Sequence, residues 1–454
     1  MVIPPAAIPV SGPELPTRGR SGSSSGLLSF LPEDATVRAN ARRNLLDGMA
    51  FSAATGLFNP FMSVLAMALG ATNYMVGLLV SLPAATGMLG QALGAVLSNG
   101  AERKLRVVVP WALAGRLFYL LFALLPFLPV PRAWVFVAAV GLMNLPASVA
   151  NLAWTALVQK LFPPEYRGRL FGQRYAFNSA VTLSATALGG WLLTKVPFPA
   201  NYTVLNLACF VCVMLSLYYL TALREPGPTA AGGERRRTTE VWTAAGRLVR
   251  NRPFVSFIGA MAAFWFGLFM PQALYPILFV REMHMSTTWI GLLYTSGGLA
   301  AALTYRFWGR FADRHGHRRT LALCATARPL HGFLYCLLHA YWAPSVVELL
   351  FCGFASGFDL CAFNSILELA PPEDSPTYIA VFNIVNGVVA LSAPMLGVWL
   401  ASLSSVRTGI GLAAAARLFG VALLWRTAGG PSGAAAGETA GKTAGRAGKA
   451  GAPA

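Results

Sequence analysis

Charged residues are scarce in this chain. They make up 11% of its 454 residues, whereas hydrophobic residues make up 56% and the mean hydropathy is +0.57. Soluble domains carry roughly 25% charged residues. A chain this long with so few charges lacks the polar surface that a water-facing exterior needs. The sequence therefore argues against an ordinary soluble protein and predicts that lipid surrounds most of the chain.

Acidic residues are the scarcer of the two signs. The chain has 17 Asp and Glu residues against 35 Lys and Arg residues, which gives a net charge of +18. Such a charge can indicate nucleic-acid binding. Here the cations lie in short loops between apolar runs, which is the pattern that orients membrane proteins. We therefore expect no nucleic acid among the partners.

Several motifs of chemistry are also missing. No G-x-x-x-x-G-K-[ST] loop is present, which argues against ATP-driven transport, and no H-E-x-x-H motif or paired acids in the apolar runs suggest an intramembrane enzyme. The first residues lack an apolar core after a basic start, so we expect no cleaved signal peptide. All six cysteines fall in apolar runs, and the C-x-x-C of Cys209 and Cys212 fits small apolar residues better than a redox or metal site. We expect no cofactor.

Apolar runs separated by short polar breaks predict twelve transmembrane helices, because a helix needs about 20 residues to cross a bilayer. The predicted fold class is an all-α membrane protein. The predicted spans are 46–69, 74–98, 107–128, 133–158, 171–194, 201–223, 254–280, 287–308, 320–341, 344–367, 377–400 and 405–426. The predicted organisation is a disordered cytoplasmic segment (1–45), a six-helix bundle (46–223), a cytoplasmic linker (224–253), a second six-helix bundle (254–426) and a disordered tail (427–454).

The distribution of Lys and Arg predicts the orientation. If both termini are cytoplasmic, 28 of the 35 cations fall on the inside, 4 fall on the outside and 3 lie within spans. Cytoplasmic loops collect Lys and Arg, so this split favours two cytoplasmic termini. We expect a multi-pass protein of the cytoplasmic membrane.

The two halves of the chain resemble each other. The sequence GLFNP at Gly56–Pro60 recurs as GLFMP at Gly267–Pro271, and PPE at Pro163 recurs at Pro371. Other short matches keep the same order at a nearly constant offset. Two parallel six-helix repeats are a known plan of transporters, with the solute site between the repeats near the membrane midplane.

One loop resembles the signature of the major facilitator superfamily, G-x-x-x-D-R-x-G-R-R. The loop reads GRFADRHGHRR, with His317 in place of the first Arg of the final pair. The residues at or directly beside the signature positions are Gly309, Asp313, Arg314, Gly316, Arg318 and Arg319. The resemblance implies two pseudo-symmetric six-helix bundles and transport by alternating access. It also implies that Asp313 and Arg314 stabilise the outward-facing state; the alternative is that these charges only anchor the loop.

The first-half copy of this loop departs from the family's pattern. Gly94 and Arg103 fit and Lys104 supplies a second cation, but Ser98 stands where the carboxylate belongs. The next cytoplasmic loop, PPEYRGRLFG, also looks like the family and carries Arg167 and Arg169. The antiporter motif G-P-x-x-G-G of the fifth span is reduced to ATALGG, which weakens a drug–proton antiporter interpretation.

Polar residues within spans are candidates for function, because an ionisable group there costs about 3 kcal/mol or more. Arg328 and Asp359 lie at equal depth on consecutive spans, which predicts an ion pair; it would be either a coupling switch or a static lock. Arg116 lacks an acid at its depth and is expected to pair with Asn144 or Asn151, or to reach toward the interface. A substrate role for Arg116 stays open.

Two proline-kinked spans carry an amide beside the kink. They are marked by Asn59–Pro60 and Pro271–Gln272. Proline removes a backbone hydrogen bond and frees a carbonyl. The amide either contacts the solute or satisfies the freed backbone group.

Taken together, these features predict a secondary active transporter of a small, amphipathic or hydrophobic solute. The expected partners are the lipid bilayer, the solute and a coupling ion, with the proton first, and the expected oligomeric state is a monomer. The alternatives are a passive facilitator and a non-transporting sensor or scaffold on the same fold.

Overall fold

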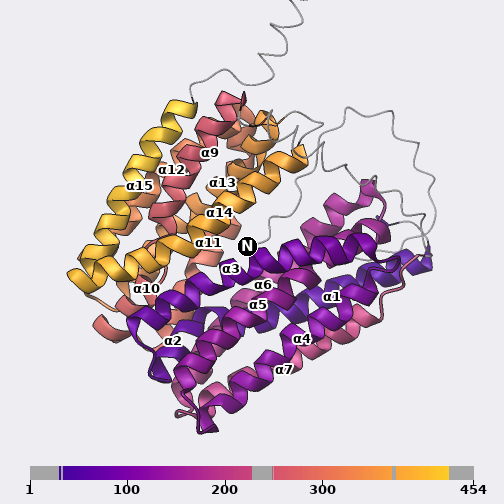
Figure 1. The fold of residues 1–454 in the computed structure, drawn as a ribbon, viewed down its shortest axis with the longest axis horizontal. Coiled ribbons are helices and arrows are strands. Elements are labelled where there is room, and N and C mark those ends of the chain that lie inside the picture. The colour runs from indigo at the N-terminus through magenta and orange to yellow at the C-terminus, as the bar shows by residue number, and fades with distance from the viewer. Residues whose placement is uncertain (1–29, 32–33, 227–247, 249, 371–374, 429–454) are drawn as a thin grey trace, which may run out of the picture. The chain divides into compact units, whose positions relative to one another are not determined.

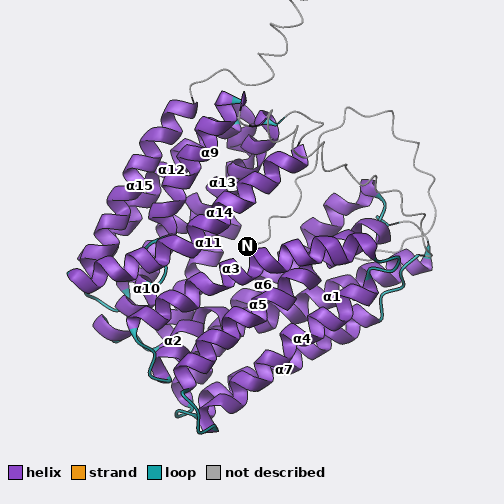
Figure 2. Ribbon diagram, viewed as in Figure 1, coloured by secondary structure: helices purple, strands orange, loops and turns teal. Residues whose placement is uncertain are grey.

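The computed structural model describes residues 30–31, 34–226, 248, 250–370 and 375–428. Within them every regular element is a helix and no strand occurs (Figure 2). The fold class predicted from the sequence is thereby confirmed. The described part leaves out the first residues of the chain and most of the predicted linker. It also leaves out the predicted tail (427–454) except for residues 427–428, which are the end of the last helix.

Twelve helical segments stand at the twelve predicted spans (Figure 1). The first six are α1 (Ala35–Phe58) continued by η1 (Asn59–Phe61) and α2 (Met62–Ala68), α3 (Asn73–Gly100), α4 (Leu105–Leu124) with η2 (Leu125–Phe127), α5 (Arg132–Leu161), α6 (Pro164–Lys195) and α7 (Ala200–Thr221). The second six are α9 (Arg252–Phe269) continued by α10 (Leu274–Ile277) and η3 (Leu278–Glu282), α11 (Thr287–His315), α12 (His317–Leu337), α13 (Ala343–Leu369), α14 (Ser375–Leu403) and α15 (Val406–Ala428).

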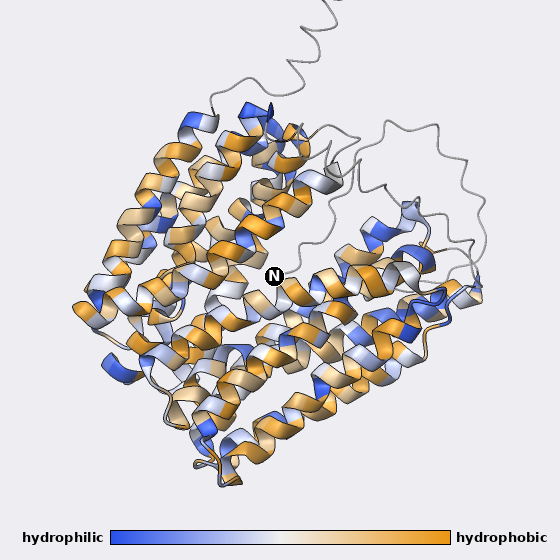
Figure 3. Ribbon diagram, viewed as in Figure 1, coloured by the Kyte–Doolittle hydropathy of each residue, from blue (hydrophilic) through white to orange (hydrophobic). Residues whose placement is uncertain are grey.

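Nine of these segments in the described residues are long and apolar enough to cross a membrane. The other three are α6, α11 and α12. The central part of α12 carries Arg328 and His331, whereas α6 and α11 carry more Ser, Thr and Gly in their central turns. Such residues are common on the faces of membrane helices that pack against other helices. Hydrophobic residues extend along the helices of both units (Figure 3).

The first helix begins earlier than the sequence predicts. Asp34 is its N-cap, and the Asp34 carboxylate accepts hydrogen bonds from the backbone N–H groups of Thr36 at 2.7 Å and Val37 at 3.4 Å. Asp is among the best N-cap residues because it satisfies the free N–H groups of the first turn. The prediction of a disordered segment through residue 45 is therefore wrong for residues 35–45, which are helical.

The chain divides into two compact units. The first comprises 1–75, 85–233 and 286–295, and the second comprises 76–84, 234–285 and 296–454. In the first unit α1 packs against α6 and α7, and α4 packs against α5 and α7. In the second unit α9 packs against α14 and α15, and α12 packs against α13 and α15.

Both repeat glycines lie where helices approach closely. A Cβ at Gly56 would lie 2.5 Å from the carbonyl oxygen of Thr182 on α6, and a Cβ at Gly267 would lie 2.7 Å from the backbone nitrogen of Arg417 on α15. No side chain fits at such distances. The glycine of the GLF repeat is therefore required for close packing of α1 and α9, as small residues are in membrane helices generally.

Candidate functional site

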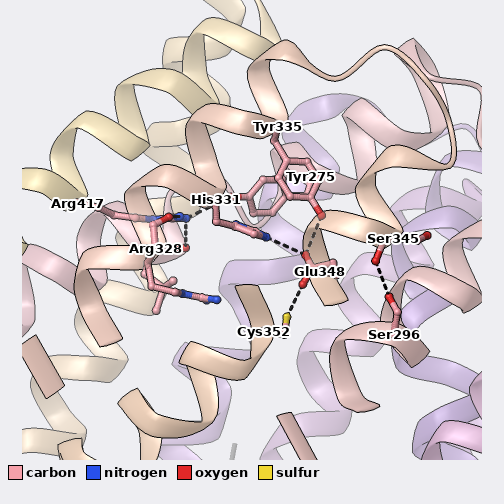
Figure 4. A network of polar contacts seen from close by, with 10 residues as sticks. Tyr275, Ser296, Arg328, His331, Tyr335, Ser345, Glu348, Cys352 and Arg417 are labelled. Carbon is pink, nitrogen blue, oxygen red and sulfur yellow. Dashed lines mark hydrogen bonds and ion pairs between the residues drawn. The ribbon is translucent and has the colours of Figure 1, made fainter. Parts of the chain in front are cut away.

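A buried polar network joins α12 and α13 in the second unit (Figure 4). The carboxylate of Glu348 accepts a hydrogen bond from the Tyr335 hydroxyl at 2.8 Å and lies 3.1 Å from Nε2 of His331. The Cys352 thiol donates to the second oxygen of the same carboxylate. Three side chains thus contact one carboxylate on two helices that are predicted to span the membrane.

Helical spacing explains why these residues meet. His331 and Tyr335 are four residues apart on α12, and Glu348 and Cys352 are four apart on α13. Side chains at this spacing lie on the same face of a helix. Neither Glu348 nor His331 was among the candidates from the sequence. The H-x-x-x-Y and E-x-x-x-C spacings on neighbouring spans were a usable signal for them.

The His331–Glu348 pair is well shielded from solvent. The side chain of His331 is 6% exposed and that of Glu348 is 17% exposed. Charges inside a membrane span are costly unless they are paired. A histidine that is hydrogen-bonded to a carboxylate can take up and release a proton near neutral pH, so this pair is chemically suited to proton transfer.

Arg417 donates hydrogen bonds to backbone carbonyls near Pro271. Pro271 has no N–H to bond the carbonyl of Gly267 four residues earlier. Nε of Arg417 donates to that carbonyl at 2.8 Å, and its Nη2 lies 3.4 Å from the carbonyl of Leu268. Arg417 is only 1% exposed and also donates to the backbone carbonyl of Arg328 at 3.0 Å and to the Tyr275 hydroxyl at 3.3 Å.

In the first unit a threonine hydroxyl donates to the carbonyl that a proline leaves free. Pro60 leaves the carbonyl of Gly56 without its helical partner. The hydroxyl of Thr186 on α6 donates to this carbonyl at 2.9 Å. The predicted kinks are present at both prolines, but neither predicted amide satisfies the freed group, and both Asn59 and Gln272 are exposed.

The predicted ion pair between Arg328 and Asp359 is wrong as a direct contact. Within the described residues neither a hydrogen bond nor an ion pair joins the two side chains, although Arg328 is the charged neighbour whose field acts on Asp359. Equal depth fixes the height of a residue along its helix, but it does not fix the direction in which the side chain leaves the helix axis. Both residues are partly buried, and Arg328 borders the Glu348 network (Figure 4).

Arg116 has an acidic partner, Asp47, which was not expected from the sequence. Its Nη2 donates to the Ser216 hydroxyl at 2.8 Å and lies 4.0 Å from the carboxylate of Asp47. Asp47 also accepts from Ser216 at 2.6 Å and pairs with Arg174 at 3.1 Å. The prediction that Arg116 pairs with Asn144 or Asn151 is therefore wrong.

The rotation of the helices again explains the error. Asn144 donates to the carbonyl of Val140 on its own helix at 2.8 Å, and Asn151 is half-buried outside both networks. Arg174 completes the network of the first unit by donating to Asn44 at 2.8 Å and lying over the Trp154 ring at 4.4 Å. Neither Asp47 nor Arg174 was a candidate, because both lie at the ends of apolar runs.

The signature loop turns at a glycine. Gly316 has φ +86°, separates α11 from α12, and accepts a hydrogen bond from the Thr320 hydroxyl at 2.9 Å. Such a φ strongly favours glycine, which explains this position of the motif. Asp313, Arg314 and Arg319 are exposed, and within the described residues no side-chain hydrogen bond or ion pair fixes them.

His317 replaces an arginine of the signature and keeps a carboxylate partner. Its Nδ1 lies 2.7 Å from the Glu368 carboxylate at the end of α13. This hydrogen bond, with a smaller contribution from the charge of Asp313, raises the pKa of His317 above its ordinary value. The substitution thus makes one contact of the loop depend on pH.

The cations of the other two loops bond to helix ends. Lys104 donates to the carbonyls of Ala101 at 3.1 Å and of Ser98, and partial burial lowers its pKa. Arg167 donates to the carbonyls of Phe162 at 2.8 Å and Gln159 at 2.5 Å, near the end of α5. These contacts stabilise helix C-termini, where carbonyls lack partners.

The remaining loop cations and the cysteines lie outside the two buried networks, apart from Cys352. The guanidinium of Arg169 lies over the Phe30 ring at 4.3 Å, and Arg103 is exposed. Among the residues that the structure describes, no three His, Cys, Asp or Glu side chains are grouped as a metal site, and all six cysteines are free thiols.

Comparison with known proteins agrees with this architecture. A model of the Major Facilitator Superfamily matches residues 48–303 and 257–450. The enterobactin exporter EntS of Citrobacter koseri is 26% identical over 327 residues, which cover 70% of this chain and 73% of the exporter. Solute carrier family 67 member A1 of Homo sapiens is 32% identical over 162 residues, and these cover 34% of this chain and 37% of the human protein's length.

Solved structures show the same fold. The nucleoside transporter NupG superposes with a TM-score of 0.66 at 11% identity, over 87% of this chain and 100% of NupG. A D-xylose–proton symporter gives a TM-score of 0.63 at 16% identity, over 87% of this chain and 98% of the symporter. At these identities the likeness concerns the fold alone.

Proposed function

This chain belongs to the major facilitator superfamily, a family of membrane transporters, and from that premise we propose that it moves a small solute by alternating access with the proton as coupling ion. Family membership makes it a multi-pass membrane transporter rather than an enzyme. The identity of the coupling ion and of the solute are the proposal.

The His331–Glu348 pair carries the proposal of proton coupling. A carboxylate that is 17% exposed and hydrogen-bonded by His331 and Tyr335 is a proton site inside a membrane span. Ionisable residues at such positions commonly serve ion or proton pathways. Arg328, one turn before His331 on α12, interacts electrostatically with His331 and with Asp359, so a proton that joins or leaves the pair changes the field that acts on Arg328.

An amphipathic organic solute fits the chain best. The membrane region has few acids, whereas a solute with several hydroxyl groups would need acids and amides to bind it. The relative that is similar over 70% of this chain is named as an exporter of enterobactin. Asn59, Gln272 and Asn151 are proposed solute contacts, since all three are polar, at least partly exposed and free of the two buried networks. Export is the direction that this relative suggests.

The gate is proposed to lie at the signature loop. Asp313, Arg314, Arg318 and Arg319 are charges beside the turn at Gly316. Ion pairs that such solvent-accessible charges form are weak enough to be made and broken in each cycle. The excess of Lys and Arg supports two cytoplasmic termini in the cytoplasmic membrane of the cell. A monomer is proposed as the working unit.

Proteoliposomes test this function. The purified full-length protein is reconstituted with a pH-sensitive dye inside, and enterobactin, uridine and D-xylose are added as probes. We expect at least one probe to drive a proton flux, and Glu348→Gln to abolish that flux. The matched control is Glu282→Gln, which removes a carboxylate from an exposed ion pair with Arg407 in the same unit.

Two outcomes contradict the proposal. Solute uptake with no proton flux, indifferent to every ion gradient, would make the chain a passive facilitator. Binding without uptake of any probe would favour the sensor or scaffold alternative.

A further inference from the structure

A carboxylate reaches the first-half copy of the signature loop from elsewhere in the chain. Ser98 stands where the motif has its acid, but Glu225, directly after α7, accepts hydrogen bonds from the backbone N–H groups of Lys104 at 2.9 Å and Leu105 at 3.2 Å. Leu105 is the first residue of α4 and Lys104 is its N-cap, and α4 has no other side-chain cap. An anion at this point satisfies free N–H groups and interacts favourably with the helix dipole.

Glu225 is held in place from two further sides. Its side chain is only 3% exposed, and Nζ of Lys160, in the last turn of α5, lies 3.6 Å from its carboxylate. The preceding residue is fixed by the buried amide of Asn40 on α1, which donates to the carbonyl of Arg224 at 2.9 Å and accepts from its N–H at 3.0 Å. Residues 224–225 thus bond to α1, α4 and α5 together.

The surroundings of Glu225 are strongly basic. It borders a cavity of about 450 Å³ whose other charged lining residues are Arg103, Arg106 and Arg224. Loss of the carboxylate would leave these cations and Lys160 without a negative neighbour in the lining. The side chain is therefore a specific electrostatic partner and not an incidental cap.

We propose that Glu225 takes over the loop-holding role of the carboxylate that the first-half signature lacks, and that it positions α4 for the transport cycle. Residues 224–225 begin the segment that joins α7 to α9. Because these two residues bond to α1, α4 and α5, a displacement of residues 224–225 acts directly on the start of α4. The part of the proposal that concerns transport rests on the proposed function.

Hydrogen–deuterium exchange of the full-length protein tests the clamp itself. We expect Glu225→Ala to speed amide exchange in residues 104–108 by about 5- to 30-fold, which corresponds to the loss of about one hydrogen bond to a charged group. Glu225→Asp should restore part of the protection. The control is Glu102→Gln, which changes an exposed carboxylate of the same loop; within the described residues this carboxylate makes no side-chain hydrogen bond, and only the backbone carbonyl of Glu102 accepts one.

Transport kinetics test the positioning role. With the probe that the wild type transports, we expect Glu225→Ala to lower the maximal rate per folded molecule about fivefold or more and to leave KM nearly unchanged. The reason is that Glu225 bonds to the start of α4 and acts on the conformational step. A merely structural residue would lower only the yield of folded protein.

The outcomes separate the two proposals. Unchanged exchange in residues 104–108 would overturn the clamp, and faster exchange with an unchanged maximal rate would overturn its role in transport. A wild type that transports none of the probes contradicts the proposed function together with this transport role, while the exchange experiment still decides the clamp.

Discussion

Arg417→Met tests whether the guanidinium holds the broken end of α9 together. The substitution keeps a long apolar side chain but removes the donors to the carbonyls of Gly267 and Leu268. Each buried acceptor left without a donor costs about 1–3 kcal/mol. Removing a charge from a membrane span recovers roughly 3 kcal/mol on insertion scales. Arg417 also donates to the carbonyl of Arg328, so three carbonyls lose a donor at a total cost of about 3–9 kcal/mol. After the recovered free energy is subtracted, we expect a net loss of about 3 kcal/mol in the free energy of unfolding.

Pro271→Ala supplies the decisive comparison. Alanine at this position restores an N–H that can bond the Gly267 carbonyl, so the double variant should lose less stability than the two single variants together. We expect a coupling energy of about 1–3 kcal/mol, measured by reversible unfolding in mixed detergent micelles and followed by circular dichroism. Additivity within about 0.5 kcal/mol would refute the idea that Arg417 substitutes for the missing N–H of Pro271.

Three further predictions follow from single contacts. Thr186→Val removes the donor to the Gly56 carbonyl and should cost about 1–3 kcal/mol in the same unfolding assay, and this cost should shrink when the proline at position 60 is also replaced by alanine; an equal cost in both backgrounds would contradict the explanation. Gly316→Ala forces a side chain into φ +86° and should cost about 1–2 kcal/mol, whereas an unchanged midpoint would show that the turn relaxes. The pKa of His317 is raised by Glu368, so their contact stabilises the fold fully below pH 6.5 and loses this effect as the pH rises through the raised pKa. His317→Arg should remove this pH dependence from a series of melting curves. An unchanged pH profile would refute the assignment.

The two buried networks differ in the way they balance charge. In the first unit Asp47 lies between Arg116 and Arg174, so the acid has two cationic partners. In the second unit Glu348 has one titratable partner, His331, and two neutral donors. Because a neutral histidine can gain a proton where an arginine cannot lose one, the second network is the better candidate for coupling.

Much of the fold follows from the sequence because hydrophobicity acts on every residue of a span. The twelve spans, the all-helical class and the two proline kinks were predictable, since a helix is the only element that satisfies its own backbone in lipid without closing a barrel. The signature loop gave the family, and Gly316 was predictable as a turn residue because its backbone conformation favours glycine.

The partners of the buried charges were not predictable in the same way. Equal depth along the spans predicted a direct ion pair between Arg328 and Asp359. The two residues interact electrostatically but make no direct contact, because the sequence does not specify how each helix is rotated. Arg116 was assigned to α5, whereas its partners Asp47 and Ser216 lie on α1 and α7. The acid near Lys104 was missing from its motif position and is supplied by Glu225, 121 residues away in the chain.

The sequence by itself therefore determined which segments cross the membrane, where the chain bends and which family it belongs to, because these properties depend on local composition and on short motifs. Only the tertiary structure decided which groups satisfy the bends and the charges. Thr186 lies 130 residues from Gly56, and Arg417 lies 150 residues from Gly267. Such partners meet only when the helices pack, and the cost of an unpaired polar group in an apolar interior makes each meeting specific.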